Sequence, residues 1–161
     1  QLAKALGAEV TATASSDEKA QIARDLGADH TSDYRTETPE ALAERVTGGA
    51  GFDVVFDATG NPRAMEQGFE HVAHGGRYVL VGVVKEAIAF MDPDFHRKEL
   101  TLLGSRNATG QDFDRVVAAI RDGSAPVDRL ITHRTDLARA AMDIPRWAIE
   151  KTGLIKAVIE I

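Results

Sequence analysis

Apolar residues along this chain fall into short runs that end in small residues. Residues 52–57 (FDVVFD) form such a run, followed by Ala58 and Gly60, and residues 77–82 (RYVLVG) repeat the design. Runs of this length predict strands buried on both faces, as in a parallel sheet covered by helices. Small residues after such a strand let a ligand approach the backbone at the carboxyl edge of the sheet, where open α/β sheets bind their ligands.

Apolar spacing and capping residues predict alternating helices and strands in the rest of the chain. Ser15 and Glu18 have the spacing of a capping box, and Thr38 with Pro39 marks another helix start. The predicted helices cover residues 1–7, 17–26, 38 onward, 61–72, 92–96, 109–123 and 137–150, the last interrupted at Pro145. The predicted strands cover residues 9–14, 30–34, 52–57, 77–81, 100–104 (expected to be buried), 131–134 and 156–161.

This alternation predicts an α/β fold, a doubly wound parallel sheet of the Rossmann type. In the strand order of that fold, 3-2-1-4-5-6, the first strand separates the second from the fourth. If residues 9–14 are strand two and residues 52–57 are strand four, they should not pair directly. The loop at residues 48–51 (GGAG) precedes a strand, so we interpret it as a turn and not as a phosphate-binding loop.

The chain also has the pattern of a fragment. Residues 1–7 (QLAKALG) have helical apolar spacing and end in a glycine, with neither an N-cap nor a methionine before them. No Gly-x-Gly-x-x-Gly motif occurs in the 161 residues. We therefore expect the first strand of the sheet and its glycine loop to lie outside this chain.

Composition narrows the classes of function. The net charge is −6, and the 19 Lys and Arg residues are scattered among 25 acids, which argues against a nucleic-acid footprint. No apolar run approaches the length of a membrane-spanning helix. With no cysteine and no visible signal peptide, a cytoplasmic protein is the expectation.

Taken together, these residues resemble the medium-chain dehydrogenase/reductase family, especially its zinc-dependent alcohol, polyol and sugar-acid dehydrogenases. The resemblance covers essentially the whole chain, and the ordered set of motifs is more specific than any one of them. The matching stretches are residues 5–8 (ALGA), 19–29 (KAQIARDLGAD), 51–60 (GFDVVFDATG), 75–82 (GGRYVLVG), 92–107 (DPDFHRKELTLLGSRN) and 153–156 (GLIK).

The resemblance implies that this chain contains two parts of a family member and that a third part, the catalytic domain, lies outside it. Residues 1–130 would be a partial dinucleotide-binding domain, and residues 131–161 a C-terminal segment that packs on a catalytic domain outside this chain. In the family, that absent domain supplies the zinc ligands, so zinc is expected only there. Within this chain we assign neither catalytic nor metal-binding residues.

The end of the second strand favours NADP over NAD. An NAD enzyme places Asp or Glu there to bind the ribose hydroxyls, but this chain has Ala14, Ser15 and Ser16. These two hydroxyls with Lys19 and Tyr34 could hold a 2′-phosphate, and NADP-using relatives look similar there. The alternatives are that the serines only cap a helix while Lys19 is solvated, and that the cofactor is NAD.

Other expected cofactor contacts come from the resemblance alone. It implies that Ala58, Thr59, Val81, Gly82 and Val83 line the cofactor cleft, that Ser105 and Arg106 face the nicotinamide, and that Lys156 meets the pyrophosphate. The alternative for each is an ordinary loop residue, an exposed arginine or a plain strand cation. His71 and His74 have i,i+3 spacing but no third ligand nearby in sequence, so we interpret them as structural or solvent-facing.

We expect the intact protein to be an NAD(P)-dependent oxidoreductase that transfers hydride between nicotinamide and an alcohol or polyol and its ketone or aldehyde. A small-molecule substrate and a homo-oligomer, dimer or tetramer, are expected, with no nucleic acid or membrane partner. The 161 residues alone should be inactive. The alternatives are a zinc-free quinone reductase that uses NADPH and a non-catalytic nucleotide-binding module.

Overall fold

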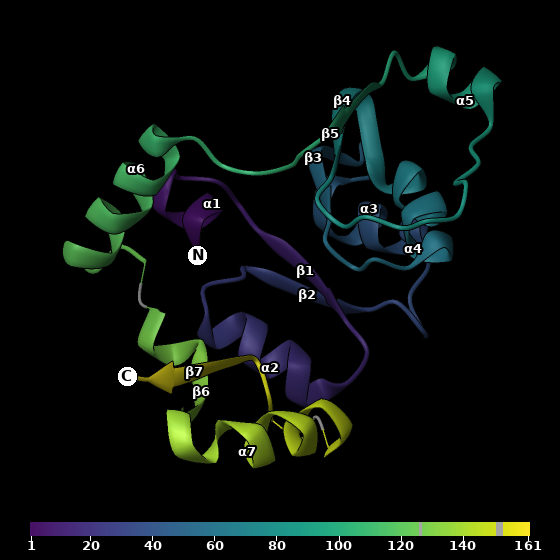
Figure 1. The fold of residues 1–161 in the computed structure, drawn as a ribbon. Helices are drawn as coiled ribbons and strands as arrows, with labels where there is room; N and C mark the ends of the chain where they lie inside the picture. Colours follow the sequence, from purple (N-terminus) through teal and green to yellow (C-terminus); the bar gives the residue numbers. More distant parts are fainter. Residues whose placement is uncertain (126, 151–152) are drawn as a thin grey trace. The chain divides into compact units, whose positions relative to one another are not determined.

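The computed structural model describes residues 1–125, 127–150 and 153–161. The chain divides into two compact units, residues 10–109 and residues 1–9 with 110–161. The predicted boundary at residue 130 remains a prediction. Helices and parallel strands alternate in both units (Figure 1), so the predicted α/β class is confirmed.

The first part of the larger unit is a parallel two-stranded sheet with a helix beside it. Strand β1 (Thr11–Ala14) pairs with β2 (His30–Asp33), and Ala14 lies opposite Asp33 in the register. Helix α2 (Asp17–Asp25) contacts both strands. The Ser16 side chain caps this helix by accepting a hydrogen bond from the Lys19 backbone. The predicted capping box at Ser15 is therefore wrong by one residue, because Ser15 bonds the side chain of Lys19 instead.

Helix α3 (Pro39–Thr47) follows β2 and begins and ends as its sequence predicts. The Thr38 hydroxyl accepts a hydrogen bond from the Ala41 backbone, and Pro39 occupies the first turn, where its missing N–H costs nothing. Gly48 ends the helix in the left-handed conformation, φ 61°, which favours glycine. Residues 48–51 then turn the chain into the next strand, as expected.

The second part of this unit is a three-stranded parallel sheet in the order β3-β4-β5. Its strands are β3 (Phe52–Asp57), β4 (Val72–Leu80) and β5 (Thr101–Gly104). The connections contain α4 (Pro62–Gln67), the 3-10 helix η1 (Gly68–His71) and α5 (Asp92–Arg97). Among the described residues no pairing joins β1 to β3, which agrees with the predicted strand order.

Tyr78 lies at the centre of the core beneath this sheet. Its side chain is fully buried, and its hydroxyl donates a 2.8 Å hydrogen bond to the Met65 carbonyl. The Phe69 ring meets it edge-on at 4.7 Å between centroids, and Val72 and Leu100 complete the cluster. Burial, and secondarily the charge of Asp57, raises the pKa of the Tyr78 hydroxyl. The core therefore holds β4 against η1 and α4.

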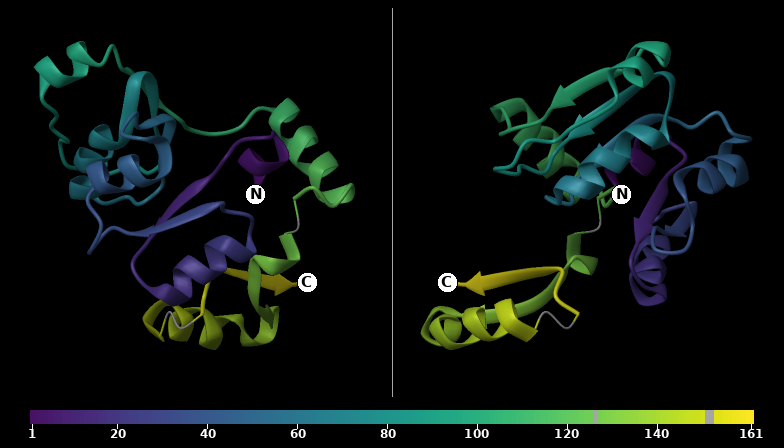
Figure 2. Two further views of the ribbon diagram at one scale, coloured as in Figure 1. Left: turned by 180° about the vertical axis from the view of Figure 1, so that it is seen from behind. Right: turned by 90° about the vertical axis from the view of Figure 1, so that its right-hand side faces the viewer.

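The smaller unit contains a second parallel pair. Strand β6 (Ile131–Asp136) pairs with β7 (Lys156–Glu160), and α7 (Leu137–Glu150) lies alongside the pair in both views of Figure 2. The buried Asp143 on α7 accepts a 2.6 Å hydrogen bond from Thr135 on β6. The unit also contains α1 (Leu2–Ala5), α6 (Gly110–Arg121) and η2 (Val127–Arg129).

Several predicted elements differ from those observed. The helix predicted at 61–72 ends at Gln67, and Val72 already belongs to β4, because its side chain joins the core from the strand. Helix α7 continues through Pro145 without the predicted interruption. Residues of β3 and β5 are not buried on both faces: Phe56 is 64% exposed, and every residue of β5 is exposed.

The described helices include none that is long and apolar enough to cross a bilayer.

Candidate functional site

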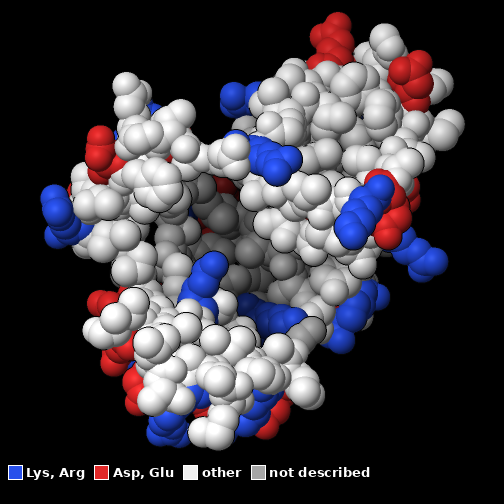
Figure 3. Space-filling view, in the orientation of Figure 1, with Lys and Arg blue, Asp and Glu red and all other residues white. Residues whose placement is uncertain are grey.

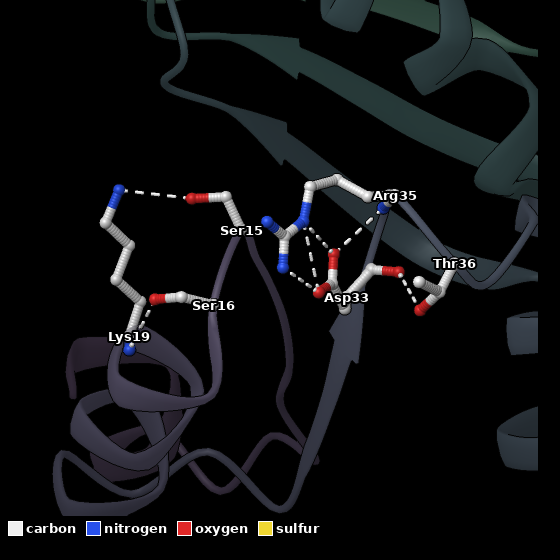
Figure 4. A network of polar contacts seen from close by, with 6 residues as sticks. All are labelled: Ser15, Ser16, Lys19, Asp33, Arg35 and Thr36. Carbon is white, nitrogen blue, oxygen red and sulfur yellow. Dashed lines mark hydrogen bonds and ion pairs between the residues drawn. The ribbon is translucent and has the colours of Figure 1, made fainter.

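The carboxyl ends of β1 and β2 bring together the residues predicted to read the cofactor ribose. The Lys19 ammonium donates a 3.1 Å hydrogen bond to the Ser15 hydroxyl, and Ser16 caps α2 one residue later (Figure 4). Tyr34 follows β2 directly and is 60% exposed. Hydroxyls, an ammonium and an exposed phenol therefore gather at adjacent strand ends, with no carboxylate among residues 14–16 at the end of β1.

Two charged residues beside this group were missed by the sequence analysis. Arg35 donates from Nε to Oδ1 of Asp33 at 2.9 Å and from Nη2 to Oδ2 at 2.5 Å (Figure 4). The hydrogen bond from Arg35 lowers the pKa of Asp33 to about 2. The available signal was an Asp at the end of a strand, because an Asp that opens a turn accepts a hydrogen bond from the backbone N–H two residues on, as Asp33 does from Arg35 at 2.9 Å.

A second group lies at the carboxyl ends of β3, β4 and β5. The Asp57 carbonyl accepts hydrogen bonds from the backbone N–H groups of Val81 and Gly82 at 2.8 and 2.9 Å. The buried Asp57 carboxylate accepts a 2.9 Å hydrogen bond from the Thr59 hydroxyl, which fixes the loop after β3. In the same way, the N–H of Ser105 bonds the Leu80 carbonyl at 2.9 Å.

A shallow groove of about 410 Å³ opens at these strand ends. Its wall is formed from the loops after β4 and β5 together with Met65, and four of the predicted residues line it: Gly82, Val83, Ser105 and Arg106. Ala58 approaches Gly82 from the loop after β3. The structure therefore brings Ala58, Thr59, Val81, Gly82, Val83, Ser105 and Arg106 to the same strand ends, and their contact with a cofactor remains a prediction.

The geometry here suits a ligand that runs close to the backbone. A Cβ on Gly82 would lie 2.7 Å from the Gly60 nitrogen, closer than real Cβ atoms come to backbone. Only glycine at position 82 keeps the loops after β3 and β4 this close together. Exposed backbone, small residues and hydroxyls at parallel strand ends fit a dinucleotide, the ligand that such edges bind.

A larger hollow of about 910 Å³ lies in the same unit but at the opposite, amino ends of these strands. Gly51, Val72 and Leu100, which precede or begin β3, β4 and β5, are among the residues that line it. Because open parallel sheets bind ligands at their carboxyl edge, we place the candidate site at the groove near Gly82 despite the smaller volume.

The remaining predicted residues lie apart from these two groups. Lys156 begins β7 in the other compact unit, and its contact with a pyrophosphate remains a prediction. His74 is exposed with Nδ1 3.1 Å from the Lys98 carbonyl, and burial lowers the pKa of His71. Within the described part of the chain no three His, Asp or Glu side chains are placed to hold a metal ion.

On the face shown in Figure 3, the Lys and Arg side chains of the described residues do not form a continuous basic area. Lys and Arg side chains are scattered over this face, several of them beside Asp or Glu. This distribution matches the scattered basic residues of the sequence.

The sequence of this chain matches a family of known proteins and several characterised relatives. Residues 1–122 match the profile of the family described as "Zinc-binding dehydrogenase". L-galactonate-5-dehydrogenase from Escherichia coli (strain K12) is 43% identical over 112 residues, which are 70% of this chain and 33% of that protein. D-xylulose reductase from Scheffersomyces stipitis is 34% identical over 155 residues, 89% of this chain and 42% of that protein.

Comparison with solved structures also finds a dehydrogenase. The crystal structure of 2R,3R-butanediol dehydrogenase from Bacillus subtilis matches 99% of this chain and 46% of its own, with a TM-score of 0.88 and 26% identity. This chain therefore spans less than half the length of the relatives it matches. The match extends over both compact units, since nearly all 161 residues are covered.

Proposed function

Because this chain belongs to the zinc-binding dehydrogenase family, we propose that it is the cofactor-binding part of an NAD(P)-dependent oxidoreductase. The substrate would be an alcohol, polyol or sugar acid and its ketone or aldehyde, the classes named by its relatives. One observation carries this proposal: the predicted cofactor residues lie at carboxyl ends of parallel strands, where Gly82 keeps two loops in close contact.

The residues of the groove would bind and orient the cofactor. The lack of a side chain at Gly82 would let a flat ring lie against the strand ends, while Val83 would offer an apolar wall. The Ser105 hydroxyl and the Arg106 guanidinium supply the polar contacts that fix a carboxamide or phosphate. When bound, the nicotinamide supplies the hydride chemistry, and the role of this chain is to position it.

We infer that NADP is preferred to NAD. The support is the donor set at the ends of β1 and β2: the Ser15–Lys19 pair at 3.1 Å, the Ser16 hydroxyl and the exposed Tyr34. A 2′-phosphate accepts hydrogen bonds from such groups and is attracted by the ammonium. The one carboxylate that ends β2, Asp33, already accepts hydrogen bonds from Nε and Nη2 of Arg35, which leaves fewer of its lone pairs for ribose hydroxyls.

Zinc is named by the family, but the described residues do not form a site for it. We propose that any zinc of the intact protein is held outside this chain, and no step above depends on it. A homo-oligomer and a cytoplasmic location also remain proposals.

The test uses the intact protein that contains this chain. Titration with NADH and NADPH, followed by nucleotide fluorescence, should show saturable binding, tighter for NADPH. A panel of polyols, sugar acids and ketones, followed by absorbance of the reduced nicotinamide, should then show turnover with at least one secondary alcohol or its ketone. Failure of both dinucleotides to bind would contradict the proposal.

A further inference from the structure

Arg35 is a charged residue at the candidate ribose site, and the proposed function assigns it no contact with the cofactor. Its Nε and Nη2 both donate to the Asp33 carboxylate, while Nη1 has no hydrogen-bond partner among the described residues. The side chain is 56% exposed, whereas Asp33 is 22% exposed. The guanidinium is therefore held by one edge and presents the other edge to solvent.

The position of that free edge is set by the sheet. Asp33 lies opposite Ala14 in the parallel register, so Arg35 and the serines after Ala14 leave the sheet at neighbouring strand ends. Figure 4 shows the guanidinium lying above Asp33 on the side toward Ser15. Arg35 and the Ser15–Lys19 pair are thus presented at the same edge of the β1–β2 sheet.

The charges at this edge explain why a second cation is needed. Asp33 and, more weakly, Asp17 act on Arg35, and both would repel a phosphate that carries about two negative charges. Lys19 is a single ammonium beside these two carboxylates, and it already donates to Ser15. A guanidinium can pair with a carboxylate and still donate to a phosphate, because its five donors in a planar fork allow contact with two acceptors at once.

We propose that Arg35 is a specificity-determining residue, donating from Nη1 to the 2′-phosphate of NADP while Nε and Nη2 stay on Asp33. The proposal rests on the proposed function, since it requires a dinucleotide whose ribose lies at the ends of β1 and β2. In this arrangement Asp33 holds the guanidinium in place and Arg35 removes the repulsion from Asp33.

The experiment compares R35Q, D33N and the double variant D33N/R35Q of the intact protein. Binding of NADPH, NADH and 2′,5′-ADP is measured by titration, and thermal unfolding checks that each variant is folded. R97Q is the matched control, because Arg97 pairs with Asp94 at 3.1 Å on the same unit, away from the strand ends. R35K is added as the variant that keeps the charge but loses the fork.

We expect R35Q to lower the affinity for NADPH and 2′,5′-ADP about tenfold, which is the size of one lost charge-assisted hydrogen bond. The affinity for NADH should fall by less than about twofold. R35K should fall between R35Q and wild type, and R97Q should match wild type. D33N should bind NADPH at least as tightly as wild type. The double variant should remain about tenfold weaker for NADPH than D33N.

Three results would overturn the proposal for Arg35 without touching the proposed function. The first is a double variant that binds NADPH as tightly as D33N, and the second is an equal loss of affinity for NADH and NADPH in R35Q. The third is a wild-type protein that binds NADH but neither of the probes with a 2′-phosphate, NADPH and 2′,5′-ADP. If the double variant binds NADPH as tightly as D33N, Arg35 only neutralises the charge of Asp33 and makes no contact with the phosphate. A wild type that binds neither dinucleotide would instead contradict the proposed function, and this inference would fall with it.

Discussion

At the scale of single residues, close packing constrains this chain at a few identifiable atoms. The Gly68 Cα faces the Tyr78 ring so closely that a Cβ there would lie 1.9 Å from the hydroxyl oxygen. The same hydroxyl donates to Met65, so η1, α4 and β4 meet at one buried group. At the carboxyl ends of β3 and β4, Gly82 is constrained in turn by the backbone of Gly60.

Tyr78→Phe tests the buried hydroxyl. Removing it leaves the Met65 carbonyl without its partner, so the free energy of unfolding should fall by about 1–2 kcal/mol. Urea denaturation measures the change. Tyr34→Phe is the matched control: its ring is largely exposed, and its stability should stay within about 0.5 kcal/mol of wild type. Equal effects of the two substitutions would show that the Tyr78 hydrogen bond contributes nothing.

Gly82→Ala tests the close approach of the two loops at the candidate site. The added Cβ must push residues 58–60 away, so affinity for both NADH and NADPH should fall about tenfold or more in the intact protein. Gly110→Ala is the control, because a methyl group added there would meet nothing within 4 Å and Gly110 does not line the groove, so its affinity should change little. Unchanged affinity in Gly82→Ala would show that the cofactor does not depend on this contact.

At the scale of elements, ion pairs connect β2 and the loop after it to α3. Arg45 on α3 donates to both carboxylate oxygens of Glu37 at 2.8 Å and to the Thr31 carbonyl of β2 at 3.2 Å. The hydrogen bond from Arg45 lowers the pKa of Glu37 to about 2 from 4.5. This contact holds the last turn of α3 beside the loop before the helix and beside the strand whose end carries Asp33.

The depressed pKa of Glu37 predicts how stability depends on pH. A carboxylate whose pKa is lower in the folded state stabilises the fold fully above its unfolded pKa, and this contribution is lost as pH falls through the folded pKa. The free energy of unfolding should therefore decrease from pH 4.5 toward pH 2 in wild type. Glu37→Gln should decrease less steeply over this range in urea denaturation at stepped pH. Glu44→Gln changes the residue next to Arg45 on α3, outside this ion pair, and should keep the wild-type slope. If both variants keep that slope, Glu37 is not responsible for it.

At the scale of the whole molecule, the residues that we propose to contact the cofactor do not all belong to one compact unit. Both groups of predicted contacts lie in residues 10–109, whereas Lys156 lies in the other unit. The described residues include no group of three or more His, Asp or Glu side chains placed to hold a metal ion, and the chain spans less than half the length of its relatives. Binding and orienting a cofactor is the part of the reaction that we propose for these residues.

We therefore expect a polypeptide of residues 1–161 to show no turnover. NADPH with a panel of aldehydes and ketones should be consumed no faster than in buffer, because the described residues provide neither a substrate-polarising metal site nor an assigned acid. The intact protein under the same conditions is the positive control. Robust turnover by residues 1–161 alone would refute the expectation that catalysis needs a further domain.

The sequence alone determined the order of the elements and most of their ends. Thr38, Pro39, Gly7 and Gly48 act through hydrogen bonds and backbone preferences within a few residues, so their roles follow from local sequence. The strand ends that carry the cofactor residues were also predictable, because an apolar run followed by small residues marks such an end. The resemblance to a dehydrogenase family rested on the same stretches.

Only the tertiary structure decided which side chains these elements bury and which they bring together. The exposure of Phe56, the bonding of Tyr78 to Met65 and the contact of Gly82 with Gly60 depend on partners that pattern alone does not identify. The Asp33–Arg35 pair was local in sequence, yet its place beside Ser15 came from the parallel register of β1 and β2. Burial and register depend on distant partners, and local preferences do not encode them.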